Sequence, residues 1–195
     1  MSCNSSVGNM DKVINYSYGN THLNVPEEYV HRPIAISTKK KNNTGFLEIP
    51  LVDLVDKNIG NTTSKKPVLF SFLIIPDHSI NKEDEMLDMY VNRINGSVEK
   101  AIVKPSEDTG WYKVFMSNIT FTWYVTKNKV PINRSDYVAT CTENSFADAN
   151  CELPGFYATD DVFIDTVFIT ESQLIFYEDI KRRIKEFIIK WSRIS

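Results

Sequence analysis

The end of the chain places its apolar side chains along one stripe of a helix. From Leu174 onward they recur every three or four residues, which is the period of an α-helix with a single buried face. Thr170 and Gln173 resemble a capping box at its start. The apolar positions are Ile180, Ile184, Phe187, Ile188, Trp191 and Ile194. This helix is amphipathic, and we expect it to pack on another layer of the fold.

The other side of the same helix is basic. A basic helix face can bind anionic lipid or a protein partner. More often such charges only solvate a helix that packs on a sheet, and cations near the C-terminus also suit the helix dipole. The residues are Lys181, Arg182, Arg183, Lys185, Lys190 and Arg193, and we favour solvation for them.

Short apolar runs separated by turn residues precede the helix, as is typical of strands. The run at residues 68–75 is almost entirely apolar, which favours a central place in a sheet. Pro50 interrupts another run and indicates an edge or a bend. Residues 119–126 alternate strictly, as a half-buried antiparallel strand does. We expect strands within residues 21–25, 29–38, 46–55, 68–75, 98–103, 111–116, 119–126, 137–141 and 162–169.

One internal segment, residues 81–95, has helical spacing with acids at its start, and Asn95-Gly96 ends it. The expected fold class is therefore α+β, with a mainly antiparallel sheet, one long C-terminal amphipathic helix and one short internal helix. Residues 19–195 form a single domain in this interpretation, and the polar residues 1–18 form a flexible tether. A chain of 195 residues that is 42% hydrophobic is long enough to bury a core.

The cysteines indicate an exported protein. Cys141 and Cys151 bracket a polar, turn-like segment, which predicts a disulfide and an oxidising compartment, although two reduced thiols are the alternative. Cys3 follows Ser2 and precedes a short polar stretch, as the acylated cysteine of a bacterial lipoprotein does, so we expect a lipid anchor there. An incidental cysteine is the alternative, and the lipidation argument fails if Met1 is the natural initiator.

Motifs of catalysis are missing from the sequence. The three histidines form no zinc-binding pattern, and no phosphate-binding loop or nucleophile elbow occurs, so we expect no metal, no cofactor and no catalytic residues. Asp77-His78 is interpreted as a turn at a strand end. The net charge of −3 disfavours nucleic acid as a partner.

Acidic clusters are the remaining candidates for a binding surface, because they can steer and hold a basic partner. The first cluster, with one neighbouring aromatic residue, lies on the predicted internal helix, and a second precedes the last predicted strand. A solvated acidic face is the alternative explanation. The candidate contact residues are Glu83, Asp84, Glu85, Asp88 and Tyr90, followed by Asp160 and Asp161.

Fragments of the chain resemble the periplasmic immunity proteins of type VI secretion antibacterial effectors, especially those paired with lipase effectors. The resemblance covers about 75 residues in pieces and leaves the middle of the chain unmatched. It implies a non-enzymatic periplasmic lipoprotein that binds and neutralises a cognate toxic effector. The fragments are Ser2-Cys3-Asn4-Ser5, residues 19–29, Cys141 with Cys151, residues 160–164, Phe168 and residues 187–191.

Two other classes of protein stay open at this point. One is a structural or ligand-binding periplasmic lipoprotein without a toxin partner. The other is a secreted eukaryotic or viral glycoprotein, because seven N-x-S/T sequons occur. An Asn-, Ile- and Lys-rich composition, typical of AT-rich bacterial genomes, also explains the sequons, and we favour that explanation. The sequons begin at Asn4, Asn15, Asn42, Asn61, Asn95, Asn118 and Asn133.

Overall fold

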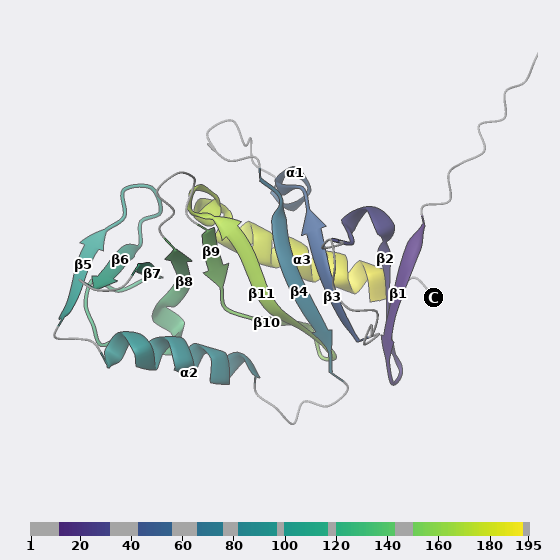
Figure 1. Cartoon of the computed structure of the whole chain (residues 1–195), viewed down its shortest axis with the longest axis horizontal. Coiled ribbons are helices and arrows are strands. Elements are labelled where there is room, and N and C mark those ends of the chain that lie inside the picture. Colours follow the sequence, from purple (N-terminus) through teal and green to yellow (C-terminus); the bar gives the residue numbers. More distant parts are fainter. Residues whose placement is uncertain are drawn as a thin grey trace, which may run out of the picture.

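A long antiparallel sheet, with one helix against each face, organises the protein (Figure 1). The computed structural model describes residues 12–31, 43–55, 66–75, 82–96, 100–116, 120–142 and 150–192. The strand order is β3-β4-β11-β9-β8-β7-β6-β5, and β10 pairs with the first part of β11. The strands are β3 (Thr44–Ile49), β4 (Val68–Ile74), β5 (Ala101–Pro105), β6 (Tyr112–Met116), β7 (Phe121–Val125), β8 (Tyr137–Thr142), β9 (Asn150–Leu153), β10 (Phe156–Thr159) and β11 (Val162–Thr170).

The predicted helix at the end of the chain is confirmed as α3 (Tyr177–Ser192). Thr170 and Gln173 form the expected capping box, which begins a 3-10 segment, η5 (Glu171–Phe176), that leads into α3. The fully buried Gln173 also donates from Nε2 to the carbonyl of Lys66 at 2.6 Å. The cap therefore anchors the helix start to the chain just before β4.

The larger hydrophobic core lies between α3 and the sheet. On the helix side it contains the residues that the helical spacing predicted to be buried. On the sheet side it contains alternate residues of β4 and β11, which the register places on one face. The helix contributes Ile180, Ile184, Ile188 and Trp191, and the two strands contribute Val68, Phe70, Phe72, Ile74, Val162, Ile164, Val167 and Ile169.

The tether expected for residues 1–18 is wrong at its C-terminal end. Val13–Tyr18 forms β1, which pairs with β2 (Thr21–Pro26) around a turn at Gly19, where φ is +59°. Besides this pairing, the alternate residues Ile14 and Tyr16 of β1 pack on the larger core. One side chain, Tyr16, packs edge-on against Phe72 with ring centroids 5.0 Å apart. Residues 1–11 lie outside the described residues.

Pro50 divides its apolar run as predicted. β3 precedes it at one end of the sheet path, and the short helix α1 (Leu51–Leu54) follows it. The predicted strand at residues 29–38 lies mostly outside the described residues. Its first residue, Tyr29, ends the 3-10 segment η1 (Glu27–Tyr29), and Val30 forms an isolated bridge with Leu47 of β3.

The internal helix is confirmed as α2 (Lys82–Asn95), and it covers a second core on the opposite side of the sheet. The prediction that β7 is half-buried is wrong, because both of its faces are covered. Trp123 is buried in the second core, while Tyr124 is buried on the other face, in the larger core. Thr122, which the alternation placed in solvent, is also buried.

The predicted disulfide is present between neighbouring strands. Cys141 of β8 and Cys151 of β9 face each other in the antiparallel register, with Cα atoms 4.0 Å apart. The short strands β9 and β10 were not predicted. Between them, Gly155 lies so close to β11 that a Cβ atom would come within 2.6 Å of the Phe163 ring and 2.7 Å of the Asp165 carbonyl oxygen.

Candidate functional site

A continuous row of side chains crosses the sheet on the face opposite α3. We call this the front face, since it points toward the viewer in Figure 1. Antiparallel register sets each residue of the row directly opposite its neighbour, and opposite residues share a face. At one end, Val114 and Trp123 are buried beneath α2 in the second core. The row is Glu48, Leu69, Phe168, Glu152, Thr140, Trp123, Val114 and Val103.

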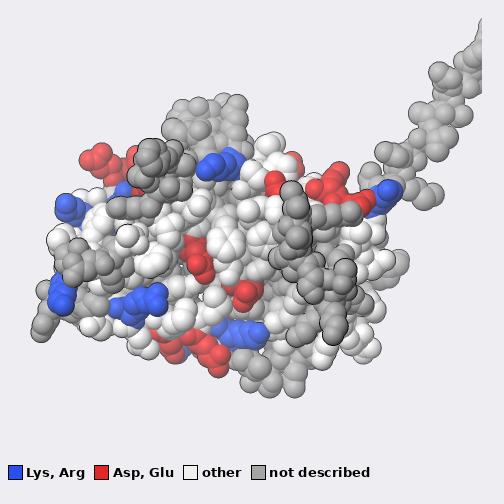
Figure 2. All heavy atoms as spheres, viewed as in Figure 1, with Lys and Arg blue, Asp and Glu red and all other residues white. Residues whose placement is uncertain are grey.

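The other end of this row forms a patch of apolar and aromatic side chains on β3, β4 and β11. The Phe46 and Phe168 ring centroids are 6.4 Å apart, and these residues flank β4 from its two neighbouring strands. The His31 ring packs edge-on against Phe46 at 5.2 Å. Phe168 remains 37% exposed. We call this patch the open face and define it as His31, Phe46, Glu48, Leu69 and Phe168; Figure 2 views the molecule from this side.

Three carboxylates lie on or beside the open face. Glu48 accepts a hydrogen bond from His31 Nδ1 at 2.7 Å. Glu152 accepts a hydrogen bond from the Tyr90 hydroxyl, also at 2.7 Å. Asp165 is exposed at an irregularity in the pairing of β11 with β4. Burial raises the pKa of Tyr90 most, and the hydrogen bond to Glu152 and the charges of Glu152 and Asp165 raise it further. Tyr90 therefore stays a neutral donor to Glu152.

The acidic cluster predicted on α2 is largely engaged within the protein. Arg134 of η4 (Arg134–Asp136) bonds Asp88 through two nitrogens, both at 2.6 Å, and lies 2.9 Å from Asp84. The hydrogen bond from Arg134 lowers the pKa of Asp88. Glu85 is exposed and Glu83 is half-buried. The cluster thus fastens α2 to η4, with Glu85 directed to solvent.

The other predicted contact residues are distributed over the molecule. Tyr90 is only 7% exposed and stacks on Tyr137, with ring centroids 4.8 Å apart, so its ring belongs to the second core. Asp160 and Asp161 form the turn between β10 and β11. Asp160 is exposed, whereas Asp161 accepts a hydrogen bond from Thr21 at 2.9 Å. The structure therefore does not gather the predicted residues into one surface.

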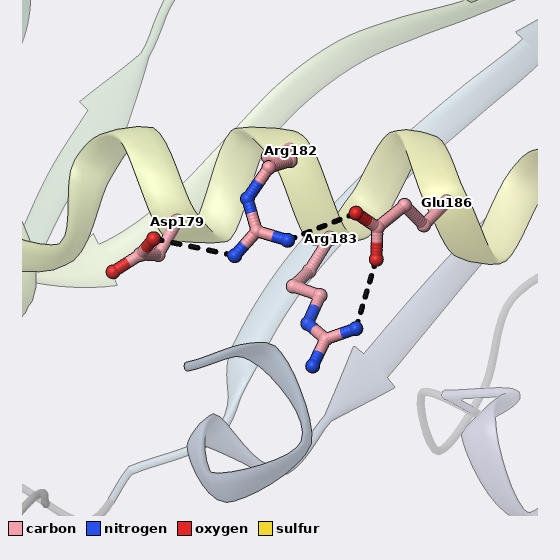
Figure 3. A network of polar contacts seen from close by, with 4 residues as sticks. All are labelled: Asp179, Arg182, Arg183 and Glu186. Carbon is pink, nitrogen blue, oxygen red and sulfur yellow. Dashed lines mark hydrogen bonds and ion pairs between the residues drawn. The ribbon is translucent and has the colours of Figure 1, made fainter. Parts of the chain in front are cut away.

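Neighbouring carboxylates pair with part of the basic face of α3. Figure 3 shows Arg182 between Asp179 and Glu186, and Arg183 beside Glu186. The shortest contact is 2.8 Å, from Arg183 to Glu186. Hydrogen bonds from Arg183 and then Arg182 lower the pKa of Glu186. Internal pairing of this kind agrees with solvation of the helix and leaves less charge to attract anionic lipid.

Cys3, Asp77 and His78 lie outside the described residues. Across the part of the chain that the structure describes, no cluster of His, Cys, Asp or Glu is arranged to hold a metal ion. Within that same part, no helix combines the length and apolar character needed to span a bilayer.

The side chain of Asn95, the first residue of one sequon, makes hydrogen bonds within the protein. Its side-chain nitrogen donates to the carbonyl of Ile132 and its side-chain oxygen accepts from the amide of Ile132, both at 2.8 Å. A glycan on that nitrogen would disturb this paired contact between α2 and the chain before η4. Asn95 therefore weakens the glycoprotein interpretation.

Comparison with known proteins finds a similar structure. No family model matches the chain, and no curated protein sequence matches it. The solved structure of Smlt3025, described as an immunity protein of the Stenotrophomonas maltophilia type IV secretion system, aligns with a TM-score of 0.56. The alignment covers 93% of each chain at 11% sequence identity. The likeness is one of fold.

The open face was missed in the sequence because its members come from separate segments. Phe46, Leu69 and Phe168 each stand in an apolar run, where neighbouring residues are equally apolar. A usable signal was the alternation in β3 and β4, where Phe46 and Glu48 share one face with Leu69 and Ser71. The partner strand and its register, which decide where that face leads, could not be derived from either segment alone.

Proposed function

We propose that this protein is an immunity protein that binds a toxic effector and neutralises it. The observation that carries the proposal is the likeness in fold to a secretion-system immunity protein over 93% of both chains. A fold can host unrelated functions, so the proposal also needs a surface suited to a partner. The open face supplies the exposed ring of Phe168 and the half-buried ring of Phe46 beside carboxylates, and aromatic residues are favoured at the centre of protein interfaces.

Neutralisation in this proposal comes from occupying the toxin, without turnover of a substrate. The protein would cover the entrance to the active site of the toxin or its membrane-docking surface. Charge complementarity would speed capture. We retain the acidic residues as steering groups in this role, with Glu83 and Glu85 on α2 and Asp160 and Asp161 at the β10–β11 turn. Asp84, Asp88 and Tyr90 would act indirectly, because their contacts position α2.

The test is protection of cells that produce the candidate toxin encoded by the adjacent gene. We expect co-expression of this protein to restore growth, and the two purified proteins to form a complex at a fixed ratio. A catalytically dead toxin allows binding to be measured apart from toxicity. Growth that stays arrested, together with no detectable complex, would contradict the proposal.

The class of the toxin is the finer part of the proposal. The sequence fragments favour a lipase effector of type VI secretion, whereas the printed description of the structural neighbour concerns a type IV system. We propose a lipase-type toxin and keep the delivery system as a second question. Hydrolysis of phospholipid vesicles by the purified toxin, and its inhibition by this protein, would support the lipase assignment. Degradation of peptidoglycan or nucleic acid instead would refute it.

The compartment and the anchor are also proposals. The Cys141–Cys151 disulfide supports an oxidising compartment such as the periplasm. We propose that Cys3 carries the lipid that tethers the domain to the membrane. Mass spectrometry of protein from its native source should find acyl chains on Cys3, and the Cys3→Ser variant should leave the membrane fraction. An unmodified Cys3 thiol in native material would remove the anchor from the proposal.

A further inference from the structure

We infer that the open face is the anchor site for the toxin, and that the toxin surface fitting it presents apolar side chains flanked by lysine or arginine. This inference rests on the proposed function and adds to it which surface binds and which partner chemistry it selects. The first support is geometric. Phe46, Leu69 and Phe168 lie on three adjacent strands and the His31 ring packs on Phe46, whereas the equivalent face of β6–β8 is covered by α2.

The second support is the sign of the charges around the patch. Three register rows cross this part of the front face, and their described residues between β3 and the β9–β10 segment include no lysine or arginine. The charged side chains there are Glu48 and Glu152, and Asp165 is exposed beside them on β11. Carboxylates beside an apolar centre favour a partner that places basic groups opposite them.

The same charges disfavour a second copy of this chain as the occupant. A two-fold dimer uses the same patch on both subunits, so it would bring Glu48, Glu152 and Asp165 toward the same carboxylates of the second copy. Like charges placed together across an interface cost stability. A toxin with basic groups around an apolar ridge meets no such penalty.

Direct binding measurements with matched variants test this inference. Phe168→Asp places a carboxylate in the centre of the open face and should weaken toxin binding at least about 30-fold. Ile102→Asp is the control, because Ile102 is 52% exposed on β5, at the far end of the strand order. It should change the dissociation constant less than about twofold. Circular dichroism and thermal unfolding of both variants would verify that they fold.

A second variant avoids any dependence on packing. Asp165 is exposed, so Asp165→Lys should leave the fold intact while reversing one charge beside the patch. We expect association to slow about three- to tenfold at low salt, and the difference to shrink as salt rises. If both Phe168→Asp and Asp165→Lys bind as the parent protein does, the open face is not the anchor site. The proposed function would survive that result, because the parent protein would still neutralise the toxin.

The remaining outcomes are also decisive. If the parent protein binds no toxin, the proposed function fails and this inference fails with it. If sedimentation shows a dimer that Phe168→Asp converts to monomer, the occupant is a second copy and the inference is overturned. If Phe168→Cys resists a thiol reagent at residue 168 in the folded protein without toxin, the chain itself covers the face. Rapid labelling that the bound toxin suppresses would support the inference.

Discussion

The two ends of the front sheet face differ in what covers them. At the β6–β8 end, α2 buries Trp123 completely. At the β3–β4–β11 end, Phe168 lies in the same register row and remains 37% exposed. Both positions hold large aromatic residues, so hydrophobicity alone does not separate core from surface. A buried aromatic residue stabilises the fold, whereas an exposed one on a sheet is available to a partner.

The largest expected effect contrasts these two aromatic residues directly. Trp123→Ala should lower the free energy of unfolding by about 3–5 kcal/mol, because it empties a fully enclosed site. Phe168→Ala should cost about 1 kcal/mol, because part of its ring already faces water. Urea unfolding of both variants measures the difference. Equal losses would mean that both ends of the sheet serve stability alike.

The disulfide comes next, since it joins β8 and β9 between the two ends. Replacing both Cys141 and Cys151 by Ser should lower the free energy of unfolding by about 2–3 kcal/mol, the entropic effect of opening a loop of this length. Toxin binding by the folded fraction should persist, because neither sulfur belongs to the open face. In the Cys3→Ser background, titration of the unfolded, unreduced protein with a thiol reagent should detect no free thiol. Detection of two thiols would refute the bridge.

A smaller effect concerns pH and the contact of η5 with β6 and β7. Burial opposes ionisation of Glu171, but hydrogen bonds from Lys113 and Tyr124 together lower its pKa below the ordinary 4.5. A lowered carboxyl pKa stabilises the fold above the unfolded value, and this contribution is lost as pH falls through the folded value. Glu171→Gln should therefore flatten the fall in melting temperature between about pH 5 and 3.

The control for this measurement is Glu107→Gln, since Glu107 is exposed. It should reproduce the acid profile of the parent protein. A Glu171→Gln profile that also matches the parent would show that this ion pair adds nothing to acid sensitivity.

The smallest expected effect is on steering by α2. Arg134 already balances Asp84 and Asp88, so Glu83 and Glu85 supply the free acidic character of the cluster. Reversing both to lysine should slow toxin association about two- to threefold at low salt and leave the dissociation rate unchanged. An unaltered association rate would remove α2 from recognition. A large rise in the dissociation rate would place the anchor on α2 and contradict the role of the open face.

Local patterns in the sequence predicted a large part of the fold. The spacing of Ile180, Ile184 and Ile188 marks the buried stripe of α3, and Thr170 with Gln173 marks its cap, because both depend on residues within a few turns. The prediction stopped short at β1, where pairing with β2 decides the structure. It also failed for Tyr124 of β7, because covering its face requires elements distant in the chain.

The candidate site was predicted less well than the fold. Charge clusters are visible in a sequence, but the residue that balances them is not: Arg134 reaches Asp88 across 46 positions of the chain. Tyr90 is a residue type that often anchors a protein interface. In this protein its ring stacks on Tyr137 and its hydroxyl donates to Glu152, so the side chain is buried in the second core. The exposure of each side chain depends on such partners, so it could not be predicted from residue type alone.

The sequence by itself determined the α+β class, the long amphipathic helix, most strand positions and the Cys141–Cys151 bridge, because periodicity, capping and turn chemistry act over short separations. Only the tertiary structure decided that Phe46, Leu69 and Phe168 meet on one face where Phe168 stays exposed, while Trp123 in the same row as Phe168 is buried. β4 and β11 are about ninety residues apart in the chain. Their register, and the placement of α2 beyond the end of the open face, follow from packing of the whole domain, which no local pattern encodes.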